Sequence, residues 1–560
     1  MELFQILQKK SKYFYALLLL LGLINSVWAS SLLILINHKI NGEPLPFFND
    51  YDWVAYVVLI VAAFSMARFF QGYMITLTYD LGNELNLSIF NRLRFTNFED
   101  YQELGEERVR TAMSDVTTLQ RFPQAFIESF NAAVMVLIGI SYLLYINSAG
   151  ALAIMAVLAV LIVFYNLRSK AIQRDLNAAR DLATVYQRNV NDFLRGFKEV
   201  KMSTDRSDVL YHDYLTHNRN KVKTLTVRTL VRHMMNELLG AYSWYLGIGL
   251  VLFLLPVLLH TDARVSSSFV ITLLYLMGPT NVVISEMHEF FQMRIALERL
   301  QEFNEVIDGY AAVRTGHGTL PAPGQAQEFE SLRFENVTFE YYDDKRDQTF
   351  RLLPLNLEIK RGESIFVTGG NGSGKSTFIN LLTGLYLPLS GNIYLNGHRI
   401  DANQYPHYRN QICAIFTDCH LFGENYNRLD LTTGNHRLVA LLKKMQLTEV
   451  VPLSATETKL KVNLSKGQQK RLALINALLE DRDILVLDEW AAEQDPMFRA
   501  FFYTKIIPEL RLAGKTVIAV THDDAYFDCA RRVLKFDYGR IAADTRMEPL
   551  AGVTEVAEAY

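Results

Sequence analysis

The sequence has no excess of charge of either sign. Its 560 residues include 56 basic and 59 acidic side chains, which gives a formal net charge of −3 at pH 7. Proteins that bind nucleic acid neutralise phosphates with a surplus of lysine and arginine, so this balance argues against a nucleic-acid partner. We expect the charged side chains to form an ordinary solvated surface.

Cysteine is scarce. The three cysteines, Cys413, Cys419 and Cys529, all lie in the second half of the chain, and no two of them form a CxxC pair. An odd number of thiols without metal-ligand spacing indicates neither a disulfide framework nor a metal site. We expect inert, buried thiols and a second half that lies in the reducing cytosol.

Hydrophobic residues, by contrast, make up 50% of the chain, and they concentrate before about residue 300. A helix needs about 20 apolar residues to cross a bilayer, and each of six stretches approaches or exceeds that length. The first stretch is longer than the apolar region of a cleaved signal peptide, so we interpret it as an uncleaved membrane helix. The six predicted spans are Tyr13–Asn37, Trp53–Tyr79, Gln124–Ile146, Ala149–Leu167, Leu238–His260 and Ser267–Ser285.

Lysine and arginine are unevenly distributed between the connections. The connections after the second and fourth spans are long and basic, whereas those after the first, third and fifth are short and poor in both residues. By the positive-inside rule, the N-terminus, both long loops and the second half of the chain face the cytoplasm. Because the long loops lack clusters of proline and glycine, we expect the spans to continue as helices past the membrane.

Residues 306–330 are rich in glycine and proline and predict a linker. After it, short β-rich runs such as Ser364–Val367 and Ile484–Leu487 alternate with helical runs, which favours a parallel sheet flanked by helices. The predicted architecture is therefore a bundle of six transmembrane helices over residues 1–305, fused to a soluble α/β domain over residues 331–560.

The run from Gly369 to Ser376 fits the phosphate-loop pattern GxxxxGK[ST], directly after the predicted strand Ser364–Val367. Glycines let backbone N–H groups surround phosphates, and the N-terminus of the following helix adds partial positive charge. Lys375 is expected to reach the β- and γ-phosphates of ATP, and Ser376 to hold Mg²⁺. In this strand–loop–helix setting a glycine turn that binds nothing is disfavoured. The other candidate ATP-binding residues of this run are Asn371, Gly372, Ser373, Gly374 and Thr377.

A second apolar run, Ile484–Leu487, ends in two carboxylates, Asp488 and Glu489. A buried strand holds Asp488 rigidly where it can bind Mg²⁺ directly or through water, and places Glu489 where it can polarise the attacking water. Together with the phosphate loop, this run predicts a site that hydrolyses nucleotide.

A third element, residues 464–468, precedes a predicted helix over Lys470–Leu479. With these three elements the chain resembles the ABC transporter family, whose signature reads LSGGQ; Lys466 replaces the first glycine of that motif. The resemblance implies that the signature of one copy closes on ATP held by the phosphate loop of another. We therefore expect a two-fold homodimer that binds two ATP with Mg²⁺. The signature candidates are Leu464, Ser465, Lys466, Gly467 and Gln468.

The resemblance extends to single positions. Tyr341 matches the aromatic residue that stacks on adenine, Asp495 matches the aspartate that contacts the partner subunit, and His522 matches the histidine that contacts the γ-phosphate. One position departs from the family, because Thr417-Asp418 stands where a glutamine is usual; either residue is a candidate substitute. The segment from there to Ser465 is short, which predicts a trimmed helical subdomain.

Six spans followed by one ATPase domain match the layout of an exporter half-transporter. The residues after Leu487, with the Lys466 and Thr417 departures, make the chain similar to the bacterial subgroup that exports pyoverdine precursors, syringomycin-like lipopeptides or lasso microcins. This implies ATP-driven export of a peptide-like cargo by alternating access, in the bacterial inner membrane with membrane lipid around the spans. Polar and aromatic residues in or near the spans are the candidates for cargo binding: Arg68, Glu128, Asn131, Tyr242, Trp244, Asn281 and Glu286.

Three alternatives remain open. A flippase for lipids or lipid-linked glycans has the same fold and ATPase, a soluble ABC ATPase is disfavoured by the six spans, and an importer is disfavoured by the fused layout. For the cargo candidates, pairing between helices is an equally good explanation.

Overall fold

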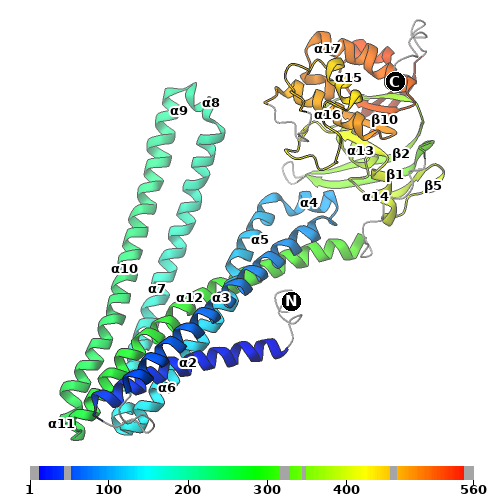
Figure 1. Cartoon of the computed structure of the whole chain (residues 1–560). Coiled ribbons are helices and arrows are strands. Elements are labelled where there is room, and N and C mark those ends of the chain that lie inside the picture. Colours follow the sequence, from blue (N-terminus) through cyan, green and yellow to red (C-terminus); the bar gives the residue numbers. More distant parts are fainter. Residues whose placement is uncertain (1–11, 43–51, 315–327, 344–347, 455–462, 548–560) are drawn as a thin grey trace. The chain divides into compact units, whose positions relative to one another are not determined.

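The computed structural model describes residues 12–42, 52–314, 328–343, 348–454 and 463–547 (Figure 1). The chain divides into two compact units. Unit 1 comprises Met1–Phe90 and Arg110–Glu302, and unit 2 comprises Asn91–Val109 and Phe303–Tyr560. The boundaries of both units fall inside long helices.

Unit 1 is helical. By length and composition, five of its described helical segments are apolar enough to cross a membrane. The predicted fourth span falls on α7, whose described apolar stretch is the shorter Ser148–Val157; further side chains of that span are outside the described set. The main helices are α2 (Lys12–Ile40), α3 (Asp52–Leu93), α5 (Glu106–Leu119), α6 (Phe122–Ile146), α7 (Ser148–Arg195), α10 (His217–Gly249), α11 (Leu255–Leu259) and α12 (Ala263–Arg314).

The long helices extend well beyond the length needed to cross a bilayer, as predicted. The helix α3 has 42 residues, α7 has 48 and α12 has 52, against about 20 for one crossing. The helix α12 continues to Arg314, so it enters the predicted linker, and residues 315–327 of that linker lie outside the described residues.

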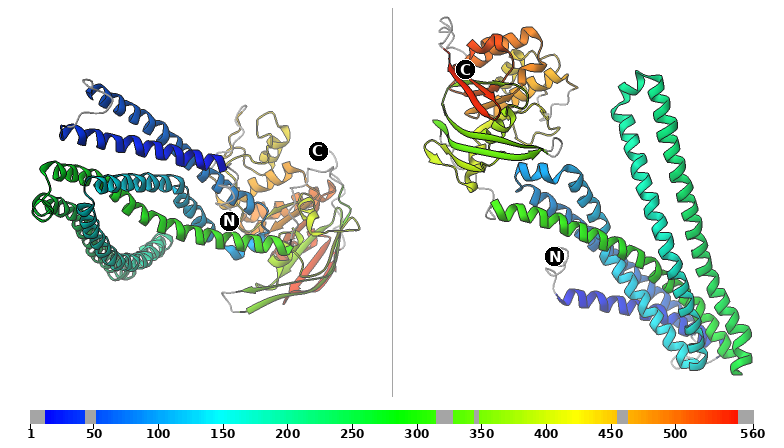
Figure 2. Two further views of the ribbon diagram at one scale, coloured as in Figure 1. Left: turned by 90° about the horizontal axis from the view of Figure 1, so that it is seen from below. Right: turned by 180° about the vertical axis from the view of Figure 1, so that it is seen from behind.

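The helices α7 and α10 lie side by side as an antiparallel hairpin (Figures 1 and 2). Two short helices, α8 (Phe197–Lys201) and α9 (Thr204–Val209), form its tip, and a π-helical segment η1 (Leu210–Thr216) leads into α10. A second π-helical segment, η2 (Leu250–Leu254), follows α10 inside the predicted fifth span. The second long loop is thus helical throughout most of its length, as expected.

Unit 2 contains two sheets. The larger has the strand order β10-β9-β3-β8-β7-β6, in which β9, β3, β8, β7 and β6 are parallel and β10 is an antiparallel edge strand. This confirms the predicted parallel sheet. Its strands are β3 (Ser364–Gly369), β6 (Ile412–Ile415), β7 (Ile484–Asp488), β8 (Thr516–Val520), β9 (Arg532–Asp537) and β10 (Arg540–Arg546).

The parallel strands are buried on both faces, which explains their continuous apolar sequences. All residues of β7 and β8 are buried. One face of the sheet packs on α13 (Lys375–Leu382) around Phe378, and the other packs on helices that include α16 (Lys466–Glu480) around Leu474 and Trp490.

A second, antiparallel sheet was not predicted. Its strand order is β2-β1-β4-β5, with β1 (Ser331–Asp343), β2 (Gln348–Lys360), β4 (Ser390–Leu395) and β5 (His398–Arg399). The strands β1 and β2 share a core with the parallel sheet, in which Phe334, Phe378 and Phe536 are fully buried. In the described part of the segment after Thr417, α15 (His436–Lys444) is the longest helix, which agrees with a trimmed helical subdomain.

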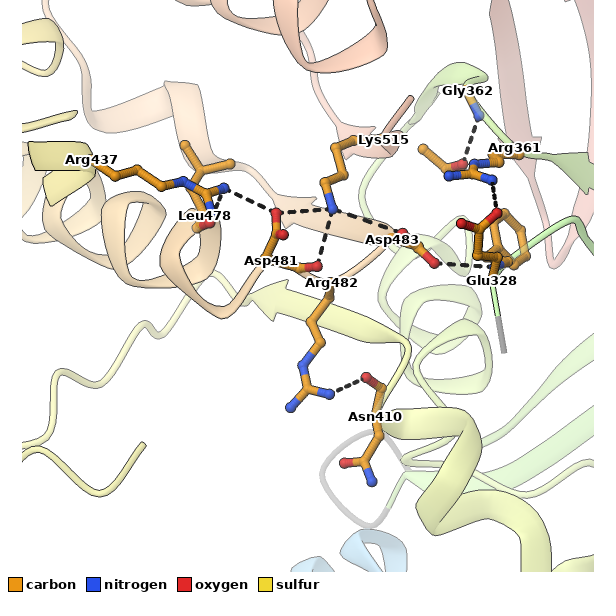
Figure 3. A network of polar contacts seen from close by, with 12 residues as sticks. Glu328, Arg361, Gly362, Asn410, Arg437, Leu478, Asp481, Arg482, Asp483 and Lys515 are labelled. Carbon is orange, nitrogen blue, oxygen red and sulfur yellow. Dashed lines mark hydrogen bonds and ion pairs between the residues drawn. The ribbon is translucent and has the colours of Figure 1, made fainter. Parts of the chain in front are cut away.

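A polar network ties together the ends of the strands opposite the phosphate loop (Figure 3). Lys515, before β8, forms ion pairs with Asp481 at 3.2 Å and Asp483 at 3.8 Å, and Asp483 accepts a hydrogen bond from the backbone N–H of Phe329. Arg437 donates to Asp481 from α15. These contacts join α15 and α16 to the sheet, so the opposite end of the sheet is held by side chains as well as by the strand ladder.

Unit 2 also contains the short helix α4 (Phe98–Leu104), which is far in the sequence from the rest of the unit, Phe303–Tyr560. The ring of Phe98 stacks on that of Tyr386 at 6.2 Å, and the Tyr386 hydroxyl donates to Gln102 Oε1 at 2.8 Å. Tyr386 in turn stacks on Phe339 at 4.7 Å. The first long loop thereby packs against the α/β fold of the same unit.

Candidate functional site

Four adjacent parallel strands bring the predicted nucleotide-site residues to one edge of the sheet. The phosphate loop follows β3 and His522 follows β8. Asp488 ends β7 and Glu489 comes directly after it, and Thr417 follows β6. These strands are neighbours in the order β3-β8-β7-β6. In open α/β sheets, ligands bind beyond the carboxyl ends of the strands, so this edge is the expected place for nucleotide.

The phosphate loop has a backbone that only glycine adopts easily at three positions, Gly369, Gly372 and Gly374. Gly369 has φ of 145°, and a Cβ there would lie 2.2 Å from the backbone oxygen of Phe536. Gly374 has φ of 101°, and its Cβ would lie 2.9 Å from Phe350 Cζ. The hydroxyl oxygen of Ser373 is buried and has no hydrogen-bond partner among the described residues. A buried, unpaired polar oxygen in a glycine-rich loop before the N-terminus of a helix fits a phosphate ligand.

Lys375 lies in this loop as predicted. Its Nζ donates to the backbone oxygens of Gly369 at 2.8 Å and Gly370 at 3.0 Å, so the ammonium group points back into the loop. Burial lowers the pKa of Lys375, and the carboxylates of Glu489 and Asp488 oppose that effect. On the same segment Asn371, Gly372 and Ser376 are exposed, whereas Thr377 is buried.

Thr417 rather than Asp418 contacts the predicted Mg²⁺ ligand. The Thr417 hydroxyl donates to Asp488 Oδ2 at 2.9 Å, and both Thr417 and Asp418 are exposed. Burial raises the pKa of the Asp488 carboxyl, and the hydrogen bond from Thr417 partly offsets this. The Asp488 carboxylate and the Ser376 hydroxyl, at the start of α13, are hard oxygen donors of the kind that Mg²⁺ prefers.

Glu489 and His522 are adjacent. His522 Nε2 lies 3.3 Å from Glu489 Oε1, and both side chains are partly exposed. Glu489 adopts a left-handed backbone with φ of 48°, which costs about 1 kcal/mol in a residue that has a Cβ. Its backbone N–H donates to Val520 at 3.2 Å, and its backbone oxygen accepts from Lys470 Nζ at 3.0 Å. These contacts hold its strained turn, so the carboxylate projects beyond the end of β7.

The signature residues cap α16. Ser465 is the N-cap, and its side chain accepts from the backbone N–H of Gln468 while Gln468 Oε1 accepts from the backbone N–H of Ser465. Leu464 is buried and Lys466 is exposed. A Cβ on Gly467 would lie 2.7 Å from the backbone oxygen of Glu493, so this position needs glycine because another segment passes close to it.

That segment is joined to the signature helix by a network that sequence reasoning missed. Arg471 donates to Gln494 Oε1 at 2.8 Å and to Asp495 Oδ2 at 2.7 Å, and its guanidinium lies 3.5 Å from the centre of the Phe498 ring. Gln494 Nε2 donates to the backbone oxygen of Gly467 at 3.1 Å. The signature and the predicted partner-contacting Asp495 therefore form one rigid piece.

Tyr341 belongs to an aromatic group on the antiparallel sheet. Its ring lies 5.5 Å from that of Phe350, which itself approaches the phosphate loop at Gly374. Tyr341 is 38% exposed, so part of its ring is accessible to a base.

The three cysteines are free and partly buried, and burial raises the pKa of Cys413 to about 12.

The cargo candidates, all in unit 1, do not form one group. Arg68, Tyr242 and Asn281 are exposed, whereas Trp244 is buried with Val251 and Phe269 and lines an apolar cavity of about 190 Å³.

Asn131 lies against Gly22 of α2, and its buried Oδ1 has no hydrogen-bond partner among the described residues. Glu128 on α6 lies opposite Glu286 on α12, because Arg121 meets Glu289 and Gly139 meets Leu276 along the same two helices. The structure thus assembles one pair of the predicted cargo residues.

Known proteins resemble both parts of the chain. A family model described as ABC transporter matches residues 352–492. The chain is 29% identical to the ATP-binding protein SyrD of Pseudomonas syringae pv. syringae over 540 residues, which cover 94% of each chain. It is 25% identical to the ATP-dependent lipid A-core flippase of Ralstonia nicotianae over 89% of this chain and 84% of the flippase. It is also 30% identical, over 221 residues, to the energy-coupling factor transporter ATP-binding protein EcfA1 of Streptococcus mutans serotype c, of which it covers 78%.

Proposed function

Because the chain belongs to the ABC transporter family, we propose that it exports a cyclic or otherwise modified peptide across the bacterial inner membrane, driven by hydrolysis of ATP. The observation that carries the proposal is similarity to SyrD over 94% of both chains, which spans the membrane helices as well as the ATPase. The functional division falls between residues 1–305, which form the membrane pathway, and residues 331–560, which bind and hydrolyse nucleotide.

In the proposed ATP site each residue has one task. Lys375 leaves the backbone oxygens of Gly369 and Gly370 and binds the β- and γ-phosphates, while Tyr341 stacks on adenine. Ser376 and Asp488 would hold Mg²⁺, and the metal would supply positive charge against the phosphate oxygens. Glu489 orients the attacking water and accepts its proton, and His522, 3.3 Å from that carboxylate, contacts the γ-phosphate.

A homodimer completes the proposed site. Each chain has one phosphate loop and one signature, and the exposed Ser465 and Lys466 at the start of α16 face away from their own core. We assign the signature to the ATP of the second copy, which gives two equivalent sites under two-fold symmetry. ATP then closes the two ATPase domains, the helical cytoplasmic loops transmit the closure, and hydrolysis resets the pathway.

A lipid flippase is the second candidate function, because the chain is also similar to a lipid A-core flippase over most of both lengths. The two candidates differ in what stimulates hydrolysis. Purified protein in lipid nanodiscs is given either a cyclic lipopeptide or lipid A, and ATPase rates are compared. Stimulation by the lipopeptide supports export of peptides, whereas stimulation by lipid A alone overturns it in favour of the flippase.

A further inference from the structure

The helices α6 and α12 of unit 1 pack antiparallel in a defined register. Arg121 Nη1 lies 3.6 Å from Glu289 Oε2, and the rings of Phe122 and Phe290 meet edge to face at 6.3 Å. Further along, a Cβ on Gly139 would lie 2.6 Å from Leu276 Cδ2. From the first two contacting pairs to the third, the residue numbers increase along α6 and decrease along α12. The interface therefore extends over several turns of both helices.

Three carboxylates gather at one end of this interface, and we call Glu128, Glu286 and Glu289 the carboxylate cluster. Glu286 is 9% exposed, and its Oε2 is buried without a hydrogen-bond partner among the described residues. In the register set by Arg121–Glu289 and Gly139–Leu276, Glu128 lies opposite Glu286, and Glu289 follows Glu286 by about one turn of α12. Arg121 is more than half exposed and pairs with Glu289, so the cluster keeps an excess of negative charge.

A buried carboxylate oxygen that lacks a partner costs free energy, and it costs more beside other carboxylates. A ligand that supplies a positive charge removes this cost, because ammonium and guanidinium groups donate charge-assisted hydrogen bonds to carboxylates. Ionisable side chains at the edge of a span commonly mark a substrate path.

We propose that the carboxylate cluster binds a positively charged group, an amine or a guanidinium, of the exported cargo. This rests on the proposed export function and narrows its substrate to cationic peptides. Glu286 follows the sixth predicted span and Glu128 lies in the second turn of α6, so by the predicted topology both are at the cytoplasmic ends of their spans. The cluster therefore meets the cargo as it enters from the cytoplasm.

The test uses the full-length protein in nanodiscs and one pair of probes. The first probe is a cyclic peptide that carries ornithine side chains, and the second is the same peptide with those amines acetylated. The Glu286→Gln variant removes the buried charge. Glu298→Gln is the matched control, because Glu298 lies on the same helix and pairs with Arg294 in an exposed setting.

Binding is measured by titration, and elution as a single symmetric peak in size-exclusion chromatography reports that each variant is folded. The wild type and Glu298→Gln are expected to bind the amine peptide about tenfold more tightly than the acetylated one, and Glu286→Gln to lose this difference. Glu286→Asp is expected to keep it, which preserves the test if the glutamine variant fails to fold. Equal binding of both peptides to the wild type, or unchanged discrimination in Glu286→Gln, overturns the proposal.

A transport assay in vesicles separates this proposal from the export function. Uptake of both peptides at equal rates by the wild type and by Glu286→Gln leaves export standing and overturns the role of the cluster. If the wild type binds the amine peptide more tightly than the acetylated one but transports neither, the result supports the cluster as a cation site. It also shows that these peptides are not the cargo.

Discussion

Replacing Thr417 by valine removes one hydroxyl and keeps the shape of the side chain. In the structure this hydroxyl donates to Asp488 Oδ2 at 2.9 Å. A hydrogen bond to a charged group contributes roughly 1.5–3 kcal/mol when it is buried. Thr417 is exposed, however, so water can replace the lost donor, and we expect a cost of about 1 kcal/mol. That free energy corresponds to about a fivefold change in an equilibrium constant.

The change should appear in the dependence on Mg²⁺, because Asp488 is the proposed ligand. We expect Thr417→Val to need about fivefold more Mg²⁺ for half-maximal ATPase activity, and for Mg²⁺-dependent binding of a fluorescent ATP analogue. Both measurements are made on the full-length protein. The binding measurement separates a loss of metal affinity from a loss of turnover.

Two controls make this prediction specific. Thr417→Ser keeps the hydroxyl and should retain the wild-type dependence, and Asp418→Asn changes the neighbouring exposed residue and should have little effect. If Asp418→Asn shifts the Mg²⁺ dependence while Thr417→Val leaves it unchanged, Asp418 is the functional substitute and our reasoning from the hydrogen bond is refuted.

Other changes probe the rest of the ATPase site. Glu489→Gln should still bind ATP while hydrolysis falls by about a hundredfold or more, since water activation is lost; unchanged turnover would exclude the assigned role. Arg471→Met should destabilise unit 2 by about 2 kcal/mol, because the buried Gln494 side chain loses its hydrogen-bond donor, and a thermal melt that matches the wild type would contradict this. Burial raises the pKa of Cys413 to about 12, so its thiol should remain protonated at pH 8. We expect Cys413 to react with a maleimide on the order of a thousandfold more slowly than a free cysteine. Rapid labelling, followed by mass spectrometry, would show that the thiol is accessible and ionised.

The sequence was sufficient to predict the strand, loop and helix around Lys375 and the strand that ends at Asp488. Both predictions rest on local signals, namely a glycine pattern of fixed spacing and a continuous apolar run. The helix after Ser465 was predicted to begin at Lys470 but begins at Lys466, because Ser465 and Gln468 satisfy each other's backbone groups at its first turn. A serine followed three residues later by glutamine was the signal for this earlier start.

Contacts between distant segments could not be predicted from the sequence. Nothing local to Arg471 indicates that it binds Gln494 and Asp495, since that depends on how α16 packs against the end of β7. The choice between Thr417 and Asp418 likewise required the position of Asp488 on a neighbouring strand. The antiparallel sheet was missed because β1 and β2 are irregular, with register shifts on either side of Val337.

The grouping of α4 with the α/β fold affects how this protein can be dissected. A gene fragment that starts after residue 328 would encode both sheets but leave Tyr386 without Phe98 and Gln102. The bare aromatic surface would favour self-association in solution. Appending residues 91–109 through a glycine-serine tether would cover Tyr386 again. The smallest ATPase fragment that stays monomeric in solution is therefore expected to combine two separate segments of the gene.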